Sequence, residues 1–233
     1  MRVRNVQGAR SIAVLALCLV AVSACTSGGD GDDKPGVGDL GGGPTAGAQS
    51  KEGLAKAAIG AKDIPGHTIA AAGAAAVTDK DVTVSDDDKD CLPVAHALAG
   101  VPVGKTRSTT PGQQVTGSGV TTTVTLGLYE GQGGQSAMEQ LSGALETCAG
   151  GFEASVKGTP QQLTDVKADL APQGAEQAMA YTANVEKAGK TVPVKVVVFR
   201  KGTTVGYLSA TGTPGKKLDF PTKVFEAQLV KLA

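Results

Sequence analysis

Three neighbouring β-prone runs in the C-terminal half most constrain the fold of this chain. Residues 176–186 alternate weakly between apolar and polar side chains, residues 192–200 are the most β-prone stretch, and residues 203–210 follow closely. The segments between them, 187–190 and 201–202, are short and contain glycine. Because such turns join strands that run in opposite directions, this spacing predicts an antiparallel meander.

The segment before these runs predicts a strand, a helix and two more strands. Residues 121–129 alternate between apolar and polar side chains, as a half-buried strand does. Residues 136–148 have apolar side chains at helical spacing and begin with Ser136 and a glutamate three positions later, the pattern of a capping box. Residues 152–157 and 163–168 are two short strand candidates.

Three further segments have apolar side chains at helical spacing: residues 51–62, 91–98 and 221–232. Residues 67–71 are a weak strand candidate. The acidic stretch 79–90 and the Gly-, Pro-, Ser- and Thr-rich stretch 101–119 are expected to be an exposed loop and a long connection. The sum predicts an α+β fold: an antiparallel sheet of about five to six strands packed against helices at both ends of the domain.

The N-terminus has the layout of a secretory signal peptide. Arg2, Arg4 and Arg10 form a basic region. Residues 11–22 are an apolar run of about a dozen residues, too short to cross the hydrocarbon core of a bilayer as a helix. Two small residues separate this run from Cys25.

The sequence Val22-Ser23-Ala24-Cys25 resembles the lipobox of bacterial lipoproteins. The resemblance implies cleavage before Cys25, a diacylglycerol group on its thiol and often a further acyl chain, such as palmitate, on the new terminus. Two or three such chains hold a protein stably on a membrane, whereas one does not. The alternative is an ordinary cleaved signal peptide in which Cys25 has no role.

These features divide the chain into three parts. Residues 1–24 are the expected lipoprotein signal peptide, residues 25–50 the lipidated cysteine with a Gly-rich tether, and residues 51–233 a single extracytoplasmic domain. The tether has almost nothing to bury and is expected to be disordered. The expected location is the outer face of the cytoplasmic membrane, held there by the lipid anchor.

Two cysteines, Cys91 and Cys148, lie in the expected domain, and Cys148 is on the apolar face of its predicted helix. In an exported, oxidising setting two thiols most simply form a disulfide bond. Closing a loop of about 58 residues would stabilise the folded chain by roughly 4 kcal/mol in the chain-entropy treatment. The alternative is two buried free thiols.

The charge balance argues against nucleic acid as a partner. The chain has 22 basic and 22 acidic side chains, and the signal peptide accounts for three arginines and no acid. The expected mature chain therefore has 19 basic and 22 acidic side chains, a net charge of −3. Nucleic-acid-binding domains instead concentrate lysines and arginines on one surface.

The sequence has no recognisable catalytic motif. It lacks a G-x-S-x-G elbow and an S-x-x-K motif, and its two histidines, His67 and His96, have no second ligand at zinc spacing. Asp86, Asp87, Asp88 and Asp90 form an acidic cluster without the glycine and glutamate of a calcium-binding EF-hand loop. We therefore predict a protein that is not an enzyme and holds no metal and no cofactor.

Four aromatic side chains are the candidates for lining a ligand groove on one face of the sheet. They are Tyr129, Tyr181, Phe199 and Tyr207, and all four lie in predicted strands. Core packing explains these rings equally well, because large aromatic side chains bury more apolar area than most others.

The domain combines a strand at 121–129, a helix ending in Leu-Glu-Thr-Cys-Ala-Gly-Gly-Phe at 145–152, an earlier Cys91 after acidic residues, and Val-Val-Val-Phe-Arg at 196–200. In these features it resembles the extracellular sensor domain of PknH-type serine/threonine kinases, and actinobacterial (Streptomyces-type) lipoproteins that carry this module. The resemblance implies a sheet flanked by helices, a cleft and disulfides. The kinase module usually has four cysteines in two bridges, and an aromatic residue in place of Thr147.

Three functions remain open from the sequence. The anchor, the tether and the resemblance favour a membrane-anchored, non-catalytic ligand-binding or sensor-like module, whose ligand would be an unknown small molecule. The alternative is an envelope module that binds another protein through its sheet or through the Thr-rich region 106–125. A hydrolase that depends on His67 or His96 is the least favoured of the three.

Overall fold

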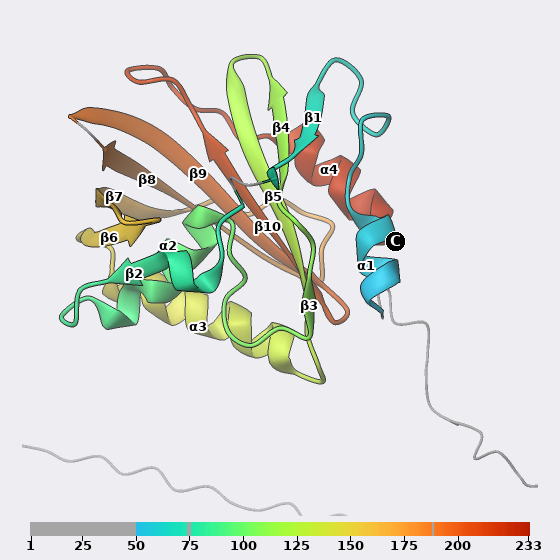
Figure 1. Ribbon diagram of the computed structural model, residues 1–233, viewed down its shortest axis with the longest axis horizontal. Coiled ribbons are helices and arrows are strands. Elements are labelled where there is room, and N and C mark those ends of the chain that lie inside the picture. Colours follow the sequence, from blue (N-terminus) through green and yellow to red (C-terminus); the bar gives the residue numbers. More distant parts are fainter. Residues whose placement is uncertain (1–49, 74–75, 188) are drawn as a thin grey trace, which may run out of the picture. The chain divides into compact units, whose positions relative to one another are not determined.

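The structure is a computed structural model that describes residues 50–73, 76–187 and 189–233. These residues form one large sheet with helices on both faces (Figure 1). The predicted signal peptide, the lipidation site Cys25 and almost all of the predicted tether lie outside the described residues. Within the described ranges, no helix combines the length and the hydropathy needed to cross a bilayer.

Ten strands make up the sheet, and all of their pairings are antiparallel. Their spatial order is β1-β4-β5-β10-β9-β8-β7-β6-β2, with β3 also paired to β5. The strands are β1 (Thr68–Ala71), β2 (Val82–Val84), β3 (Ser108–Thr109), β4 (Gln113–Gly117), β5 (Val120–Leu128), β6 (Phe152–Val156), β7 (Thr159–Asp169), β8 (Gln177–Lys187), β9 (Lys190–Lys201) and β10 (Thr204–Thr211).

The predicted antiparallel meander is confirmed. Five consecutive strands, β6 to β10, pair in the order in which they occur in the chain. The register places Lys187 opposite Lys190 and Lys201 opposite Thr204, so both connections are tight turns. Strand β5 then pairs with β10 from the other side, which buries β10 in the middle of the sheet.

The sheet has ten strands, so the prediction of about five to six strands was too low. Strand β1 falls on the weak candidate at 67–71, but β2, β3 and β4 lie in stretches that we expected to be loop or connection. Strand β4 has Val115 as its one apolar side chain that is buried, and β2 has only three residues among aspartates. Strand β4 lacks the apolar alternation that marks a strand in sequence, and the alternation of β2 covers only three residues. Pairing with neighbouring strands stabilises both.

Four α-helices among the described residues cover both faces of the sheet. They are α1 (Lys51–Ala57), α2 (Leu92–Ala99), α3 (Gly133–Thr147) and α4 (Thr222–Lys231). Helices α2 and α3 pack on one face over a core that contains Leu141 and Tyr181. Helices α1 and α4, from the two ends of the domain, share the other face over a core that contains Leu54 and Phe225 (Figure 1).

A buried glutamine joins the two terminal helices. The Gln228 side chain is fully buried; its amide nitrogen donates to the Ala57 carbonyl at 2.7 Å, and its oxygen accepts the Ile59 N–H at 3.3 Å. These two bonds satisfy backbone groups at the end of α1 that would otherwise be buried without a partner. The end of α1 is thereby fixed to α4.

Helix α3 begins earlier than its sequence pattern indicated. The predicted capping box at Ser136 is wrong: the helix starts at Gly133, its N-cap residue is Gln132, and no side chain caps it. Gly134 lies inside the helix, where a Cβ would be 3.2 Å from a Val205 methyl carbon. The glycine therefore lets the first turn of α3 approach β10 closely, a tertiary requirement that local capping rules do not contain.

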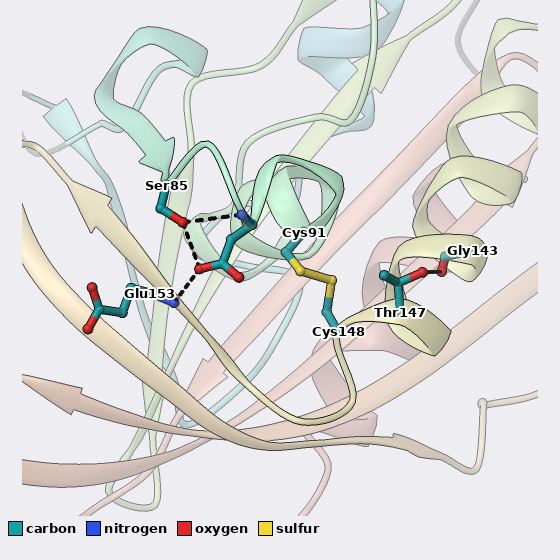
Figure 2. The surroundings of a disulfide bond; sticks show 7 residues. Ser85, Cys91, Gly143, Thr147, Cys148 and Glu153 are labelled. Atoms are coloured by element: carbon teal, nitrogen blue, oxygen red, sulfur yellow. Dashed lines mark hydrogen bonds between the residues drawn. A yellow bond between two sulfur atoms is a disulfide. The ribbon is translucent and has the colours of Figure 1, made fainter.

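The predicted disulfide bond between Cys91 and Cys148 is confirmed. Figure 2 shows the bond between two chain segments: Cys91 lies directly before α2, and Cys148 lies directly after α3. The Cα atoms are 5.7 Å apart, and both residues are buried in the core of this face. The bond ties the two helices of this layer to each other.

Candidate functional site

A large cavity lies where α2 ends over strands β4 and β5. Its volume is about 800 Å³, larger than two further cavities of about 430 and 270 Å³ among the described residues. Its walls come from residues 76–79, from the end of α2 and from the loop that follows it. Six threonines line it: Thr78, Thr106, Thr109, Thr110, Thr123 and Thr125.

The floor of the cavity is the polar end of β5. Strand geometry sends alternate side chains to opposite faces, so Val124 and Leu126 enter the core beneath α1 and α4. Thr123 and Thr125 point to the other face, where α2 covers only part of the sheet. Where α2 does not cover this face of the sheet, β5 therefore has hydroxyl groups. Where α2 and α3 cover the same face, the sheet has apolar side chains.

Two glycines bring the backbone of the walls close to these threonines. Gly100 caps α2 with a φ of 72°, and a Cβ at this position would be 3.0 Å from the Thr123 methyl carbon. A Cβ at Gly112 would be 3.5 Å from both the Thr123 methyl carbon and the Thr125 hydroxyl oxygen. A larger residue at position 100 would combine a disfavoured backbone conformation with a tight contact.

Two buried tyrosines fix the loop that forms one wall. The Tyr129 hydroxyl donates to the Val103 carbonyl at 2.7 Å, and the Tyr207 hydroxyl accepts the Val103 N–H at 3.1 Å. The two hydroxyl oxygens are 2.7 Å apart. Since Tyr129 already donates to Val103, Tyr207 is the donor between the two rings. Val103 is thus held by both of its backbone polar groups.

Burial keeps these hydroxyls protonated. It raises the pKa of Tyr207 to about 12 and also raises the pKa of Tyr129, where the charge and the hydrogen bond of the Tyr207 hydroxyl add to the effect of burial. Burial also raises the pKa of Tyr181, whose hydroxyl donates to the Val94 carbonyl of α2 at 2.9 Å. Tyr181 and Tyr129 therefore donate to the backbone of α2 and of the loop after it, and Tyr207 accepts a hydrogen bond from that loop.

The four rings proposed for a ligand groove are inside the protein. Tyr129, Tyr181 and Tyr207 lie in the core under α2 and α3, whereas Phe199 lies in the opposite core, with its ring 5.1 Å from that of Phe225 in an edge-to-face contact. All four are at most 2% exposed, so the core-packing interpretation describes them and they do not form a common groove. Two of them nevertheless hold the wall of the cavity.

The two histidines have different neighbours. His96 lies in α2, and its Nε2 atom is buried without a hydrogen-bond partner among the described residues. Burial lowers the pKa of His96, and contact with Asp79 opposes this effect more weakly. The His67 ring packs against Gly117, where a Cβ would be only 2.3 Å from the ring. His67 and His96 thus lie in different parts of the fold.

One member of the acidic cluster before α2, Asp88, stabilises the local fold. The Asp88 carboxylate accepts hydrogen bonds from the Ser85 hydroxyl at 2.9 Å and from the Glu153 N–H at 3.3 Å, as Figure 2 shows for these partners. These bonds join the segment before the disulfide to β6. In the ranges that the structure describes, no group of three or more histidine, cysteine or acidic side chains is placed to hold a metal ion.

Sequence reasoning did not find this cavity, although the Thr-rich region 106–125, which we named as a possible protein-binding surface, supplies five of its six threonines. Its loop lies in the stretch 101–119, which we interpreted as a long connection, and its floor lies in a strand that we interpreted from its apolar face. The available signal was the row of threonines on the other face of residues 121–125 together with the glycines at 100 and 112. Neither signal indicates a cavity until the two segments are known to lie together.

Comparison with known proteins gives similarities of fold only. No protein-family profile matches the chain, and no curated protein matches its sequence. The extracellular domain of PknH from Mycobacterium tuberculosis is similar at 12% identity with a TM-score of 0.49, over 80% of this chain and 96% of that one. The Rv0999 ortholog of Mycobacterium smegmatis, an uncharacterised protein, is similar at 12% identity with a TM-score of 0.38, over 77% and 96% of the two chains.

Proposed function

We propose that this chain is a membrane-anchored extracytoplasmic lipoprotein whose domain is a non-catalytic ligand-binding or sensor-like module. The observation that carries the proposal is the hydroxyl-lined cavity of about 800 Å³ at the end of α2. Cavities that hold small molecules have volumes of about 300 to 1,000 Å³ and walls that are largely formed before the ligand binds. This cavity has that size, and the tyrosine contacts to Val103 give it a fixed wall.

The chemistry of the lining supports binding over catalysis. Among the described residues that line the cavity there is no histidine and no cysteine, and Asp79 is the single carboxylate. Nucleophilic or general acid–base catalysis usually needs a nucleophile with a neighbouring base, or two groups with separated pKa values. The lining offers hydroxyls, lysines and backbone groups, which recognise polar ligands through hydrogen bonds.

The anchoring part of the proposal rests on sequence. The signal-peptide layout and the Val-Ser-Ala-Cys motif at residues 22–25 support lipidation at Cys25. Mass spectrometry of the N-terminal peptide from the producing cell tests it directly. An acylated peptide that begins at Cys25 supports the anchor, and an unmodified peptide that begins elsewhere overturns it.

Native mass spectrometry of the protein purified from the producing cell tests the binding function. We expect a small molecule to copurify with the wild type and to be lost in Thr106→Trp, which places a large ring in the cavity. The matched control is Thr213→Trp, an exposed threonine in the connection before α4, which should keep the ligand. Wild-type protein that is reproducibly empty, or a ligand retained equally by both variants, would contradict the proposal.

A second candidate function, binding to another envelope protein, is favoured by the outer edge of β1. Three of its four residues are exposed, and the strand has no charged residue and no proline. Such an edge is a template for an added strand unless charge protects it. Crosslinking on intact cells should then give one dominant partner that is lost in Ala70→Lys and kept in Thr83→Lys on the opposite edge strand, β2. Equal crosslinking by both variants would exclude this edge.

A further inference from the structure

The loop at the cavity wall contains a short span of backbone without internal hydrogen bonds. Residues Gly104, Lys105 and Thr106 all line the cavity, and none of their backbone groups has a partner among the described residues. The residues on either side are fixed: Val103 by the two tyrosines, and Arg107 by its N–H bond to the Leu128 carbonyl at 2.7 Å. Hydrogen bonds thus fix the residues on both sides of Gly104, Lys105 and Thr106, while the N–H groups of these three residues donate to no other described residue.

The net charge of the cavity lining is positive, whereas the expected net charge of the mature chain is negative. Lys51 of α1 and Lys105 line the cavity, and neither ammonium group has an ion-pair partner in the part of the chain that the structure describes. The one acidic group in the lining, Asp79, already accepts the Lys80 N–H at 3.0 Å and contacts His96. The lining thus has two cations and one anion in a protein that we expect to be acidic overall.

From these observations we infer that the cavity binds a polyhydroxylated molecule that carries one anionic group, either a carboxylate or a phosphate ester. This inference rests on the proposed binding function and assigns its ligand class. The anionic group lies at Lys105 and the adjacent N–H groups, because ammonium and amide donors make their strongest hydrogen bonds to charged oxygens. The hydroxyl groups of the ligand pair with the threonines, which both donate and accept.

The cavity also limits the size and polarity of this ligand. A volume of about 800 Å³ accommodates a molecule larger than a single anion, so the anionic group is only part of the ligand. No aromatic side chain is among the described residues of the lining, so the sugar-like body is held by hydrogen bonds and not by stacking on a ring. A hydrophobic ligand would leave buried hydroxyl groups of the lining, such as that of Thr125, without a partner.

Calorimetric titration of the full chain, purified in detergent, tests this inference with three related probes: glucuronate, glucose 6-phosphate and uncharged glucose. We expect the charged sugars to bind about tenfold more tightly than glucose, the effect of one charge-assisted hydrogen bond. Tighter binding of glucuronate identifies a carboxylate ligand, and tighter binding of glucose 6-phosphate identifies a phosphate ester. Lys105→Gln should remove this preference, whereas Lys223→Gln, an exposed lysine of α4, should keep it.

The outcomes separate this inference from the proposed function. Equal binding of all three probes, or a charge preference that survives Lys105→Gln, overturns the anionic ligand class and leaves a binding module. Failure of every probe to bind also overturns the class, while the binding function itself is decided by the copurified ligand and its loss in Thr106→Trp. An empty wild-type protein, or a copurified ligand that Thr106→Trp and Thr213→Trp retain equally, removes both.

Discussion

The hydroxyl oxygens of Tyr129 and Tyr207 lie 2.7 Å apart in the core behind the cavity wall. Together with Val103 they form a closed cycle of three hydrogen bonds, in which each tyrosine contacts the other and one backbone group of Val103. Tyr129 follows β5 and Tyr207 lies in β10, its neighbour in the sheet. The sheet therefore sets the position of a loop that is distant in sequence.

Substitution of the two tyrosines should show that their hydroxyls act together. We expect Tyr129→Phe and Tyr207→Phe each to lower the free energy of unfolding by about 1–3 kcal/mol, because each leaves a buried Val103 group without a partner. The double variant should lose less than the sum, since the first substitution already breaks the cycle. Urea denaturation measures all three values.

The control for this cycle combines Tyr207→Phe with Tyr181→Phe. The Tyr181 hydroxyl donates to Val94 and shares no hydrogen bond with the other two. These two substitutions should be additive within about 0.5 kcal/mol, as expected for independent sites. Additivity of the Tyr129 and Tyr207 pair as well would mean that the observed cycle has no energetic consequence.

Removal of the disulfide should weaken the α2 and α3 layer. The bond joins residues 57 positions apart, and in the chain-entropy treatment Cys91→Ala with Cys148→Ala should lower the free energy of unfolding by about 4 kcal/mol. Reductant should lower the stability of the wild type by a similar amount and leave the double variant unchanged. Loss of stability in the double variant on reduction would point to some other cause.

Two glycines should respond to alanine in opposite directions. A Cβ at Gly206 of β10 would be 2.4 Å from the Phe199 ring, so Gly206→Ala should lower the free energy of unfolding by about 1–3 kcal/mol through overpacking. Gly143 lies inside α3 with open space around the Cβ position. Gly143→Ala should therefore raise the free energy of unfolding by about 0.5–1 kcal/mol. Thermal unfolding of both variants checks the contrast, and a shift in the same direction would contradict it.

The pH dependence of stability should include a contribution from Asp63. The Gly60 N–H and the Lys231 ammonium donate to its carboxylate and hold the pKa of Asp63 below its usual value of 3.8. Because the pKa of Asp63 is lower in the folded state than in the unfolded state, its ionisation stabilises the fold at pH values above the unfolded-state pKa. This contribution is lost as the pH falls through the folded-state pKa. Asp63→Asn should therefore be less stable than the wild type at neutral pH, by about 1 kcal/mol or less for a pair near the surface.

The difference between wild type and Asp63→Asn should shrink as the pH falls below about 4. Denaturant titrations at a series of acidic pH values measure this convergence. Asp219→Asn is the matched control, because the Lys217–Asp219 pair is almost fully exposed and should contribute nothing measurable at any pH. A difference that stays constant down to the lowest pH would show that the Asp63 contacts act through something other than charge.

Several elements could be predicted because their sequence patterns report burial directly. The helix with Phe225 and Leu229 on one face packs that face on the sheet, and the three C-terminal runs pair as a meander. The cysteine pair could be predicted because two thiols in a domain that we expected to be exported have one simple pairing. In each case the signal lies within about a dozen residues or depends on residue type alone.

The candidate site depended on contacts that no local pattern contains. Phe199 and Tyr207 both lie in β-prone runs, yet the pleat of β9 and β10 sends their rings to opposite faces, so a common groove does not form. The floor at Thr123 and the wall at Gly100 are likewise distant in sequence and come together only through packing of α2 on the sheet.

By itself, then, the sequence determined where this chain forms its longer helices and strands and which cysteines pair, because periodic apolar side chains and paired thiols have few ways to be satisfied. Only the tertiary structure decided that polar segments such as β4 join the sheet and that the threonine face of β5 remains partly uncovered. The physical reason is that polar strands and cavities are stabilised by pairing and packing between distant segments, whose partners are not encoded in the neighbouring residues.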